Sequence, residues 1–455
     1  MSDYLPDEVV LKILHRLPVK SLIRFRCVSK SWNSLITTPS FINSHLSYNS
    51  SNSDKLIVRH GVGKPYLEHY KLIDDNNDSS SVQIQQIDFP LASSRFMLIG
   101  SVNGLLCLSE IERYVLWNPS IRKFITLPNP CITVKTHGRV KCRSAFGFDP
   151  RTNDYKVVRI VFQDGTTIPV VEVYSLNEGS WRITSAGNSF SPGFMFNDGG
   201  QPSASLNGAV HFVGIDRDDN FCPLVLSFDL GDEVFRIIPV PNGAFRPVDY
   251  VLTSVIGGSL SLLCHDSLKD TKQCCSIWVM KEYGVVDSWT KQLTVDLEEG
   301  QLLGLQKNGN ILVETELPVL ILCEISSYDP KSKQSKNLGI FGRPFSFCVE
   351  NYMENLVLLD KPNDSFQRRV SRKRKYSLIN VVSEEERRDK ETSHELEKKM
   401  LHLEHDIAIL KAKVMEISTL KSERAALKSQ ALRFVQQLSN QVKNMISSVG
   451  NVGSP

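Results

Sequence analysis

Residues 5–32, LPDEVVLKILHRLPVKSLIRFRCVSKSW, predict a run of short amphipathic helices. Between Pro6 and Pro18, apolar side chains recur every three or four residues, which is the spacing of one helical face. They are Val9, Val10, Ile13, Leu14 and Leu17. Pro18 ends this first helix, a second helix carries Leu22, and Ser29 is a suitable N-cap for a third.

The predicted N-terminal unit, residues 1–46, is small: three helices, the last of which is expected to end before Pro39. A unit of this size has a marginal core and usually needs a partner, a metal ion or a disulfide. The ten cysteines of the chain include no C-x-x-C pair, which favours free thiols in a reducing compartment. A protein partner is therefore expected to complete this unit.

The same stretch closely resembles the F-box motif, in the version found in the large plant F-box families. The resemblance is carried by an ordered set of short signatures: Leu5-Pro6, Leu17-Pro18, Arg24-Phe25-Arg26-Cys27-Val28 and Lys30-Ser31-Trp32. It continues to Leu46 without a gap. The F-box binds a Skp-type adaptor, which links it to a cullin scaffold, so the resemblance implies both partners.

Carried over by position, the resemblance places the adaptor contacts at the start of the motif, along its apolar stripe and at two later positions. The residues are Leu5, Pro6, Val9, Val10, Ile13, Leu14, Leu17, Val28 and Trp32. The alternative interpretation is that these side chains only pack the core of the helices. That alternative weighs more for Trp32 than for Leu5 and Pro6, which lie at the outer end.

The central region, residues 55–364, follows a Ser/Asn linker at 47–54 and has short apolar runs between turn residues, as β-structure does. One turn-then-strand unit recurs, with turns at Asn103-Gly104, Asn207-Gly208, Gly257-Gly258 and Asn308-Gly309. These turns lie about 50 or about 100 residues apart, and further units fall near residues 154–158 and 354–358. Six such units predict a six-bladed β-propeller, because a pair of β-sandwiches would not explain the spacing.

The central region also resembles the F-box-associated domain, which implies a propeller that binds a target protein. The resembling segments are Gly104–Leu108, Trp117-Asn118-Pro119 and Phe146–Asp149. Four tryptophans recur near strand or turn positions, and they are more typical of blade core than of a binding cage. They are Trp117, Trp181, Trp278 and Trp289.

Signatures of catalysis are missing from the sequence: it has no G-x-S-x-G, P-loop, G-x-G-x-x-G or H-E-x-x-H. The nearest metal candidate is Cys264-His265 with Cys274-Cys275, but adjacent residues of a strand point to opposite faces. His402 and His405 lack a second pair of ligands. We therefore predict a non-catalytic chain with no metal and no cofactor, and keep a carbohydrate-active propeller enzyme as an alternative.

A basic run lies in the linker predicted at residues 365–382: Arg368, Arg369, Arg372, Lys373, Arg374 and Lys375. It is a candidate nuclear-localisation signal, or else a solvated linker. Residues 366–455 hold 18 Lys or Arg and 11 Asp or Glu, so the rest of the chain is mildly acidic. This division argues against direct nucleic-acid binding.

Residues 383–447 contain neither proline nor glycine and predict a long coiled-coil helix, followed by a disordered tail at 448–455. Apolar residues follow a four-then-three spacing along the seam: Leu396, Met400, Leu403, Ile407, Leu410, Val414 and Ile417. A helix of this length does not bury such a stripe alone, so we expect a homodimer or another helical partner. Packing against the propeller is the alternative.

The fold class is thus multidomain: α-helical at the N-terminus, all-β in the centre and a long helix at the end. The resemblance implies the substrate receptor of a Skp–cullin–F-box ubiquitin ligase, which acts by proximity and supplies no chemistry. The alternative is a nuclear coiled-coil scaffold that uses its F-box outside a ligase. The chain has no membrane span and no secretory signal, so we expect it in the cytoplasm, the nucleus or both.

Overall fold

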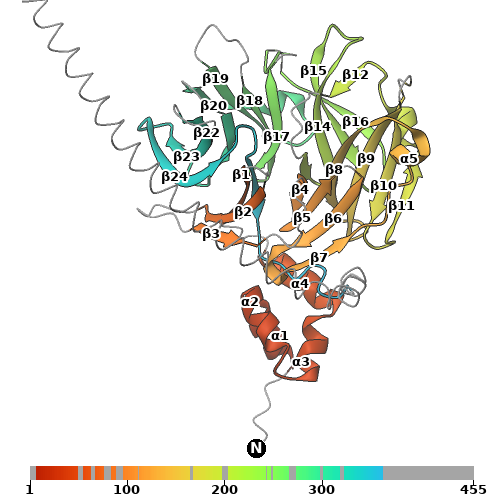
Figure 1. Ribbon diagram of the computed structural model, residues 1–455, viewed down its shortest axis with the longest axis vertical. Coiled ribbons are helices and arrows are strands. Elements are labelled where there is room, and N and C mark those ends of the chain that lie inside the picture. The colour runs from red at the N-terminus through yellow and green to blue at the C-terminus, as the bar shows by residue number, and fades with distance from the viewer. Residues whose placement is uncertain are drawn as a thin grey trace, which may run out of the picture. The chain divides into compact units, whose positions relative to one another are not determined.

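The computed structural model describes an N-terminal helical unit and six antiparallel sheets (Figure 1). The residues described are 7–49, 55–62, 67–75, 84–88, 96–110, 112–163, 166, 168–196, 203–241, 243–246, 249–265, 273–297, 301–317 and 322–361. The predicted basic run, coiled coil and tail all lie outside them. No helix within these ranges is long and apolar enough to cross a membrane.

The helical unit has four helices where three were predicted. They are α1 (Asp7–His15), α2 (Val19–Phe25), α3 (Lys30–Ile36) and α4 (Pro39–Asn49). Ser29 caps α3 as expected, since its hydroxyl accepts a hydrogen bond of 3.1 Å from the Trp32 amide. Pro39 follows α3 but also begins α4, where the N–H that proline lacks would have no helical partner. The prediction missed this second role of Pro39.

Six sheets form the blades of a propeller, and the strands of each blade are named from the centre outward. Blade 1 is β25 (Cys348–Tyr352), β1 (Lys55–Val62), β2 (Leu67–Asp74) and β3 (Ile84–Ile87). Blade 2 is β4 (Met97–Val102), β5 (Leu105–Glu110), β6 (Arg113–Asn118) and β7 (Lys123–Thr126), with the 3-10 helix η2 (Pro119–Ile121) before β7. Blade 3 is β8 (Val140–Asp149), β9 (Asp154–Gln163), β10 (Val170–Ser175) and β11 (Ser180–Thr184), between α5 (Val134–His137) and η3 (Ser185–Ser189).

The remaining blades repeat this order, except that the inner strand of blade 4 is split in two. Blade 4 is β12 (Phe194–Phe196) and β13 (Ala204–Leu206), then β14 (Ala209–Asp216), β15 (Cys222–Asp229) and β16 (Phe235–Pro239). Blade 5 is β17 (Tyr250–Ile256), β18 (Ser259–His265), β19 (Gln273–Met280) and β20 (Trp289–Leu297), with η4 (Val286–Ser288) before β20. Blade 6 is β21 (Gln301–Leu305), β22 (Ile311–Glu316), β23 (Cys323–Asp329) and β24 (Gln334–Gly342).

The ring is closed by blade 1, which combines the two ends of the propeller sequence. Its inner strand β25 pairs antiparallel with β1, in a register that joins Lys55 to Tyr352 and Arg59 to Cys348. The prediction of a further strand at residues 354–358 is therefore wrong, because those residues form no strand. Strand β1, from the start of the propeller sequence, already pairs with β25 and satisfies its backbone hydrogen bonds, so a strand at residues 354–358 is not needed beside it.

The tryptophans explain part of the repeat. Trp181 and Trp289 lie at the start of the outer strands of blades 3 and 5, and both indole N–H groups donate to a proline carbonyl at or just after the end of the preceding blade. These carbonyls belong to Pro128, at 2.8 Å, and Pro239, at 3.1 Å. Trp117 is also buried, so the prediction of blade-core tryptophans is confirmed for these three.

Trp278 differs from the other three tryptophans. Its ring is only partly buried, and the Lys291 ammonium lies 5.8 Å from the ring centroid. Lys291 comes from β20, the strand paired with β19, which carries Trp278. This side chain is therefore partly exposed, with a cation from the neighbouring strand near the ring.

Gly104 is required both for its turn and for close packing. Asn103 and Gly104 have φ values of +52° and +73°, as a two-residue hairpin turn between β4 and β5 demands. A Cβ on Gly104 would lie 1.8 Å from the carbonyl oxygen of Met353, whereas one on Gly309, at φ +89°, would meet nothing within 4 Å.

We expect Gly104→Ala to lower the free energy of unfolding by about 2 kcal/mol, roughly twice the effect of Gly309→Ala. Both variants carry the cost of the left-handed conformation, so their difference in urea denaturation isolates the clash with Met353. Equal destabilisation of the two variants would mean that the backbone at Met353 moves aside freely.

Candidate adaptor-binding face and central pocket

Three of the predicted adaptor contacts leave apolar side chains at the surface of the helical unit. Val9 and Ile13 on α1 are 39% and 47% exposed, and Val28, between α2 and α3, is 64% exposed. Val9 and Ile13 are four residues apart, so they share one face of α1. An apolar pair on the outer face of a helix is what a partner surface would cover.

The other predicted contacts lie deeper or outside the described residues. Leu14 is 1% exposed and belongs to the core of the helical unit, and Val10, Leu17 and Trp32 are partly buried against that core. The remaining two predicted contacts, Leu5 and Pro6, lie outside the described residues. The assignment of the whole set to adaptor binding stays a prediction; among the described residues, the accessible part is Val9, Ile13 and Val28.

The helical unit contacts blade 2. Helix α2 packs on η2, and the core of the helices is continuous with the buried side chains of blades 2 and 3. The segment after β25 joins this contact through Leu356, Val357 and Leu358, which are buried in the same cluster. Successive strands of a blade run in opposite directions, so the turn after the first strand and the turn after the third strand lie on the same face of the propeller. Helix η2 lies in the turn after the third strand of blade 2 and therefore marks this face. We call it the F-box face, and its opposite the far face.

Asn118 ties the segment after β25 to blade 2. Its side-chain amide donates to the Asn355 side-chain oxygen at 2.7 Å, the Val357 carbonyl at 2.8 Å and the Asn355 carbonyl at 3.2 Å. Its own oxygen accepts from the Ser120 amide at 2.9 Å. Sequence reasoning quoted Trp117-Asn118-Pro119 as part of a resemblance but did not find this role, since nothing local points to a partner near residue 355.

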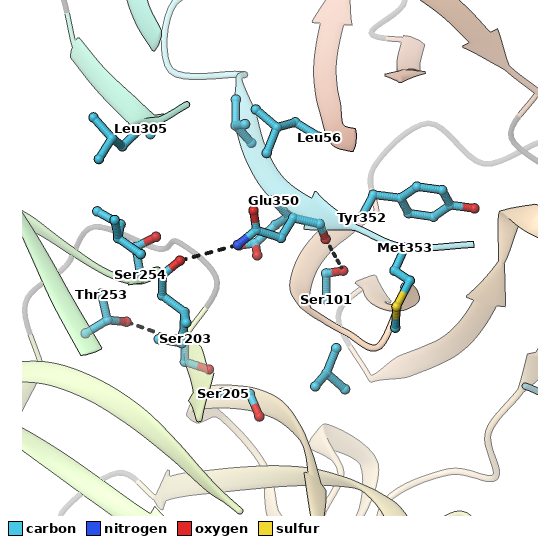
Figure 2. A pocket seen from close by; sticks show the side chains of 18 of the residues that line it. Leu56, Ser101, Ser203, Ser205, Thr253, Ser254, Leu305, Glu350, Tyr352 and Met353 are labelled. Carbon is cyan, nitrogen blue, oxygen red and sulfur yellow. Dashed lines mark hydrogen bonds between the residues drawn. The ribbon is translucent and has the colours of Figure 1, made fainter. Parts of the chain in front are cut away.

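A pocket of about 250 Å³ lies at the centre of the propeller, among the inner strands of different blades. Figure 2 shows Glu350 of β25 together with the hydroxyl-bearing residues Ser101, Ser203 and Ser254. The blades are tied across the pocket: the Asn351 side chain donates to the Val255 carbonyl at 3.3 Å, and Ser101 donates to the Asn351 carbonyl at 3.2 Å. Sequence reasoning missed this pocket, because its lining residues come from distant segments.

His211 supports the wall of this pocket in its neutral form. Its Nδ1 lies 3.0 Å from the Ala204 carbonyl and its Nε2 lies 2.7 Å from the Tyr283 hydroxyl. The carbonyl only accepts, so Nδ1 donates and Nε2 accepts from the tyrosine. Burial lowers the pKa of His211 from 6.5 to about 4.

Stability should therefore fall as the pH drops from about 6.5 to about 4, because only the unfolded His211 takes up a proton in that window. We expect His211→Gln, which remains neutral, to lose less stability than the wild type between pH 7 and pH 5 in urea denaturation. His60 and His265 also have pKa values lowered to about 4 by burial, so some slope remains in the variant. An unchanged slope would show that His211 is protonated without cost.

The candidate metal ligands form a hydrogen bond in the structure. The Cys275 sulfur lies 3.2 Å from Nδ1 of His265, whose Nε2 lies 3.2 Å from the Leu302 carbonyl. Both side chains are buried, at directly paired positions of β18 and β19. Across the described ranges there is no group of three or more potential metal ligands, and His402 and His405 fall outside those ranges.

The comparisons with known proteins agree with this architecture. Residues 3–44 match the F-box domain and residues 63–358 match the F-box associated beta propeller domain. In Arabidopsis thaliana, the F-box protein CPR1 is 31% identical over 78% of this chain and 89% of its own length. The F-box protein At3g07870 from the same organism is 27% identical over 80% and 94%.

Among solved structures, the six-bladed β-propeller lectin of Aleuria aurantia is 10% identical with a TM-score of 0.34, over 64% of this chain and 96% of that chain. A TM-score of 0.34 is too low to support a statement about the fold or function of this chain. The family assignment rests on the matched domains and the Arabidopsis relatives. On that evidence, the chain belongs to the family of F-box proteins that carry an F-box associated β-propeller domain.

Proposed function

We propose that this protein is the substrate-recognition subunit of a Skp–cullin–F-box ubiquitin ligase. The observation that carries the proposal is the exposed apolar pair Val9 and Ile13 on an F-box helix that is packed against a propeller. The F-box binds a Skp-type adaptor and, through it, a cullin. The propeller holds a target protein near the ubiquitin carrier of the ligase, so this chain contributes proximity and no catalytic group.

Adaptor binding is tested with the full chain and a purified Skp-type adaptor. We expect Val9→Glu/Ile13→Glu to weaken binding at least about 100-fold, because two carboxylates would be buried in an apolar interface. Val285→Glu changes a similarly exposed valine on the propeller and should leave the affinity unchanged. Calorimetry measures both.

A folded wild-type chain that binds no adaptor would sink the ligase proposal. Adaptor binding without cullin recruitment would favour the alternative of a coiled-coil scaffold that uses its F-box outside a ligase. Location in the cytoplasm or nucleus and dimerisation through residues 383–447 stay predictions.

For the target we propose the far face of the propeller. Phe221, in the turn between β14 and β15, and Phe345, between β24 and β25, are 51% and 77% exposed. Both have left-handed backbone, with φ values of +57° and +59°, which is unfavourable for a bulky side chain. Exposed aromatic residues held in strained turns are typical of binding surfaces.

The far-face proposal is tested by proximity labelling in plant cells with the wild type and Phe221→Ser/Phe345→Ser. The variant should lose labelled partners while it still captures the adaptor. Retention of all partners would place the target elsewhere on the chain.

A further inference from the structure

Among the described residues that line the central pocket, Glu350 on the inner strand β25 carries the one carboxyl group. Its side chain is partly accessible, and within the described part of the chain it has neither a hydrogen-bond partner nor an ion-pair partner. The other inner strands contribute hydroxyl groups to the lining, from Ser101, Ser203, Ser205, Thr253 and Ser254. Among the described residues, the rest of the lining is part polar and part apolar and carries no charged side chain.

Burial raises the pKa of Glu350 from 4.5 to about 8, and no charge among the described residues offsets the lost hydration. Of the described residues on β4, β13, β17 and β21, no Lys, Arg or His lines the pocket. On β1, which places Ile57 opposite Glu350, the two flanking cations pair with other carboxylates: Lys55 lies 3.2 Å from Glu354, and Arg59 lies 2.7 Å from Glu68. On β25 itself, the other titratable groups are Cys348, whose thiol pKa burial raises, and Tyr352, whose hydroxyl bonds to Ser120 at 2.7 Å. Neither of these groups can neutralise the Glu350 carboxylate.

A second polar group in the wall also lacks a partner. Ser203 is only 9% exposed, and its hydroxyl oxygen has no hydrogen bond in the described structure. Buried polar groups are normally paired, because an unpaired one costs free energy. The Ser203 hydroxyl is too buried to contact a ligand directly, so the unpaired carboxyl group of Glu350 is the group that a ligand in this cavity would pair with.

We propose that the central pocket binds an alkylammonium group, with Glu350 as its counter-ion. An ammonium carries three donors, which a carboxylate and neighbouring hydroxyl groups can accept, and its alkyl stem suits the apolar part of the lining. A volume of about 250 Å³ lies below the usual range for cofactors and drug-sized ligands, so it fits a side chain or a small amine. This inference does not depend on adaptor binding.

Binding is coupled to a proton. At pH 7 most of the carboxyl groups are protonated, so an arriving ammonium displaces close to one proton from Glu350. The apparent affinity follows the ionised fraction and should rise about 50-fold from pH 6 to pH 8.

The ammonium could belong to a lysine side chain of a bound protein or to a free amine. Calorimetry with n-butylamine and with the peptide acetyl-Gly-Lys-Gly-amide separates these sources, and n-butanol serves as the uncharged control. Tighter binding of the peptide assigns the pocket to protein lysines, and tighter binding of butylamine assigns it to small amines. Both outcomes require that butanol does not bind.

Glu350→Gln should reduce the affinity for the preferred amine at least tenfold at pH 8 and abolish proton release, measured in buffers of different ionisation enthalpy. Glu316→Gln, at an exposed carboxyl group outside the pocket, should change neither. If Glu350→Gln does not fold, the proposal is still tested by the pH dependence of amine affinity and by the proton release of the wild type. Absence of binding by both amines, or binding without proton release at pH 7, would overturn the proposal.

Discussion

Replacing Arg159 with Met should lower the free energy of unfolding by about 3–5 kcal/mol, the usual effect of stranding a buried charge. Arg159 on β9 and Glu172 on β10 are fully buried, with Nη1 of the arginine 2.6 Å from Oε2 of the glutamate. Both also hold the backbone of Ile132: its amide donates to Glu172 at 2.6 Å, and its carbonyl accepts from Arg159 at 2.6 Å. Without the arginine, the Glu172 carboxylate stays inside blade 3 with no countercharge. Urea denaturation at pH 7 measures the loss.

Two further variants locate the cause of this loss. Arg159→Met/Glu172→Leu should recover part of the stability, because it removes both charges, although the backbone of Ile132 then lacks both partners. Arg182→Met breaks a partly exposed pair with Glu233 and should cost under about 1 kcal/mol. A single Arg159→Met variant within about 1 kcal/mol of the wild type would mean that water reaches Glu172.

The second large effect is expected at Asn118, which is fully buried. Asn118→Leu should lower the free energy of unfolding by about 3 kcal/mol, because it strands the carbonyl groups of Asn355 and Val357 and the Ser120 amide. The segment after β25 should also loosen, since Asn118 is the centre of its attachment. We therefore expect faster tryptic cleavage at Lys361, whose carbonyl oxygen accepts a hydrogen bond from the Lys123 ammonium.

Asn188→Leu is the matched control, because Asn188 is exposed at the end of blade 3. It should change neither the stability nor the cleavage at Lys361. Lost stability in Asn118→Leu with unchanged cleavage would show that the segment is held by its apolar contacts instead, through Leu356, Val357 and Leu358.

Short-range features of this protein were predictable from the sequence. The Asn103-Gly104 and Asn207-Gly208 turns have left-handed conformations at both residues, as those residue types favour. The Ser29 cap lies where its side chain and the following helix required it. In each case the deciding interaction joins residues a few positions apart, so the local pattern contains the whole cause.

The candidate sites were predictable only in part. The apolar stripe on α1 was visible, but its spacing did not separate Leu14, which faces the core, from Val9 and Ile13, which face outward. When a helix has apolar residues on two faces, the face that is buried depends on which elements pack against the helix, and the spacing does not show this. The sequence did not show that Glu350 is unpaired, because its partners depend on which residues of other blades line the pocket. None of the described lining residues is a cation.

By itself the sequence determined the F-box helices, the turn-and-strand repeat and the six-bladed fold that follows from its spacing. Only the tertiary structure decided that β1 closes the ring against β25, that Asn118 holds the segment after β25, and that Glu350 faces an uncharged pocket. The physical reason is chain separation. Pairing between the two ends of a propeller gains its free energy only after the ring has closed, so neither local propensity nor periodicity records it.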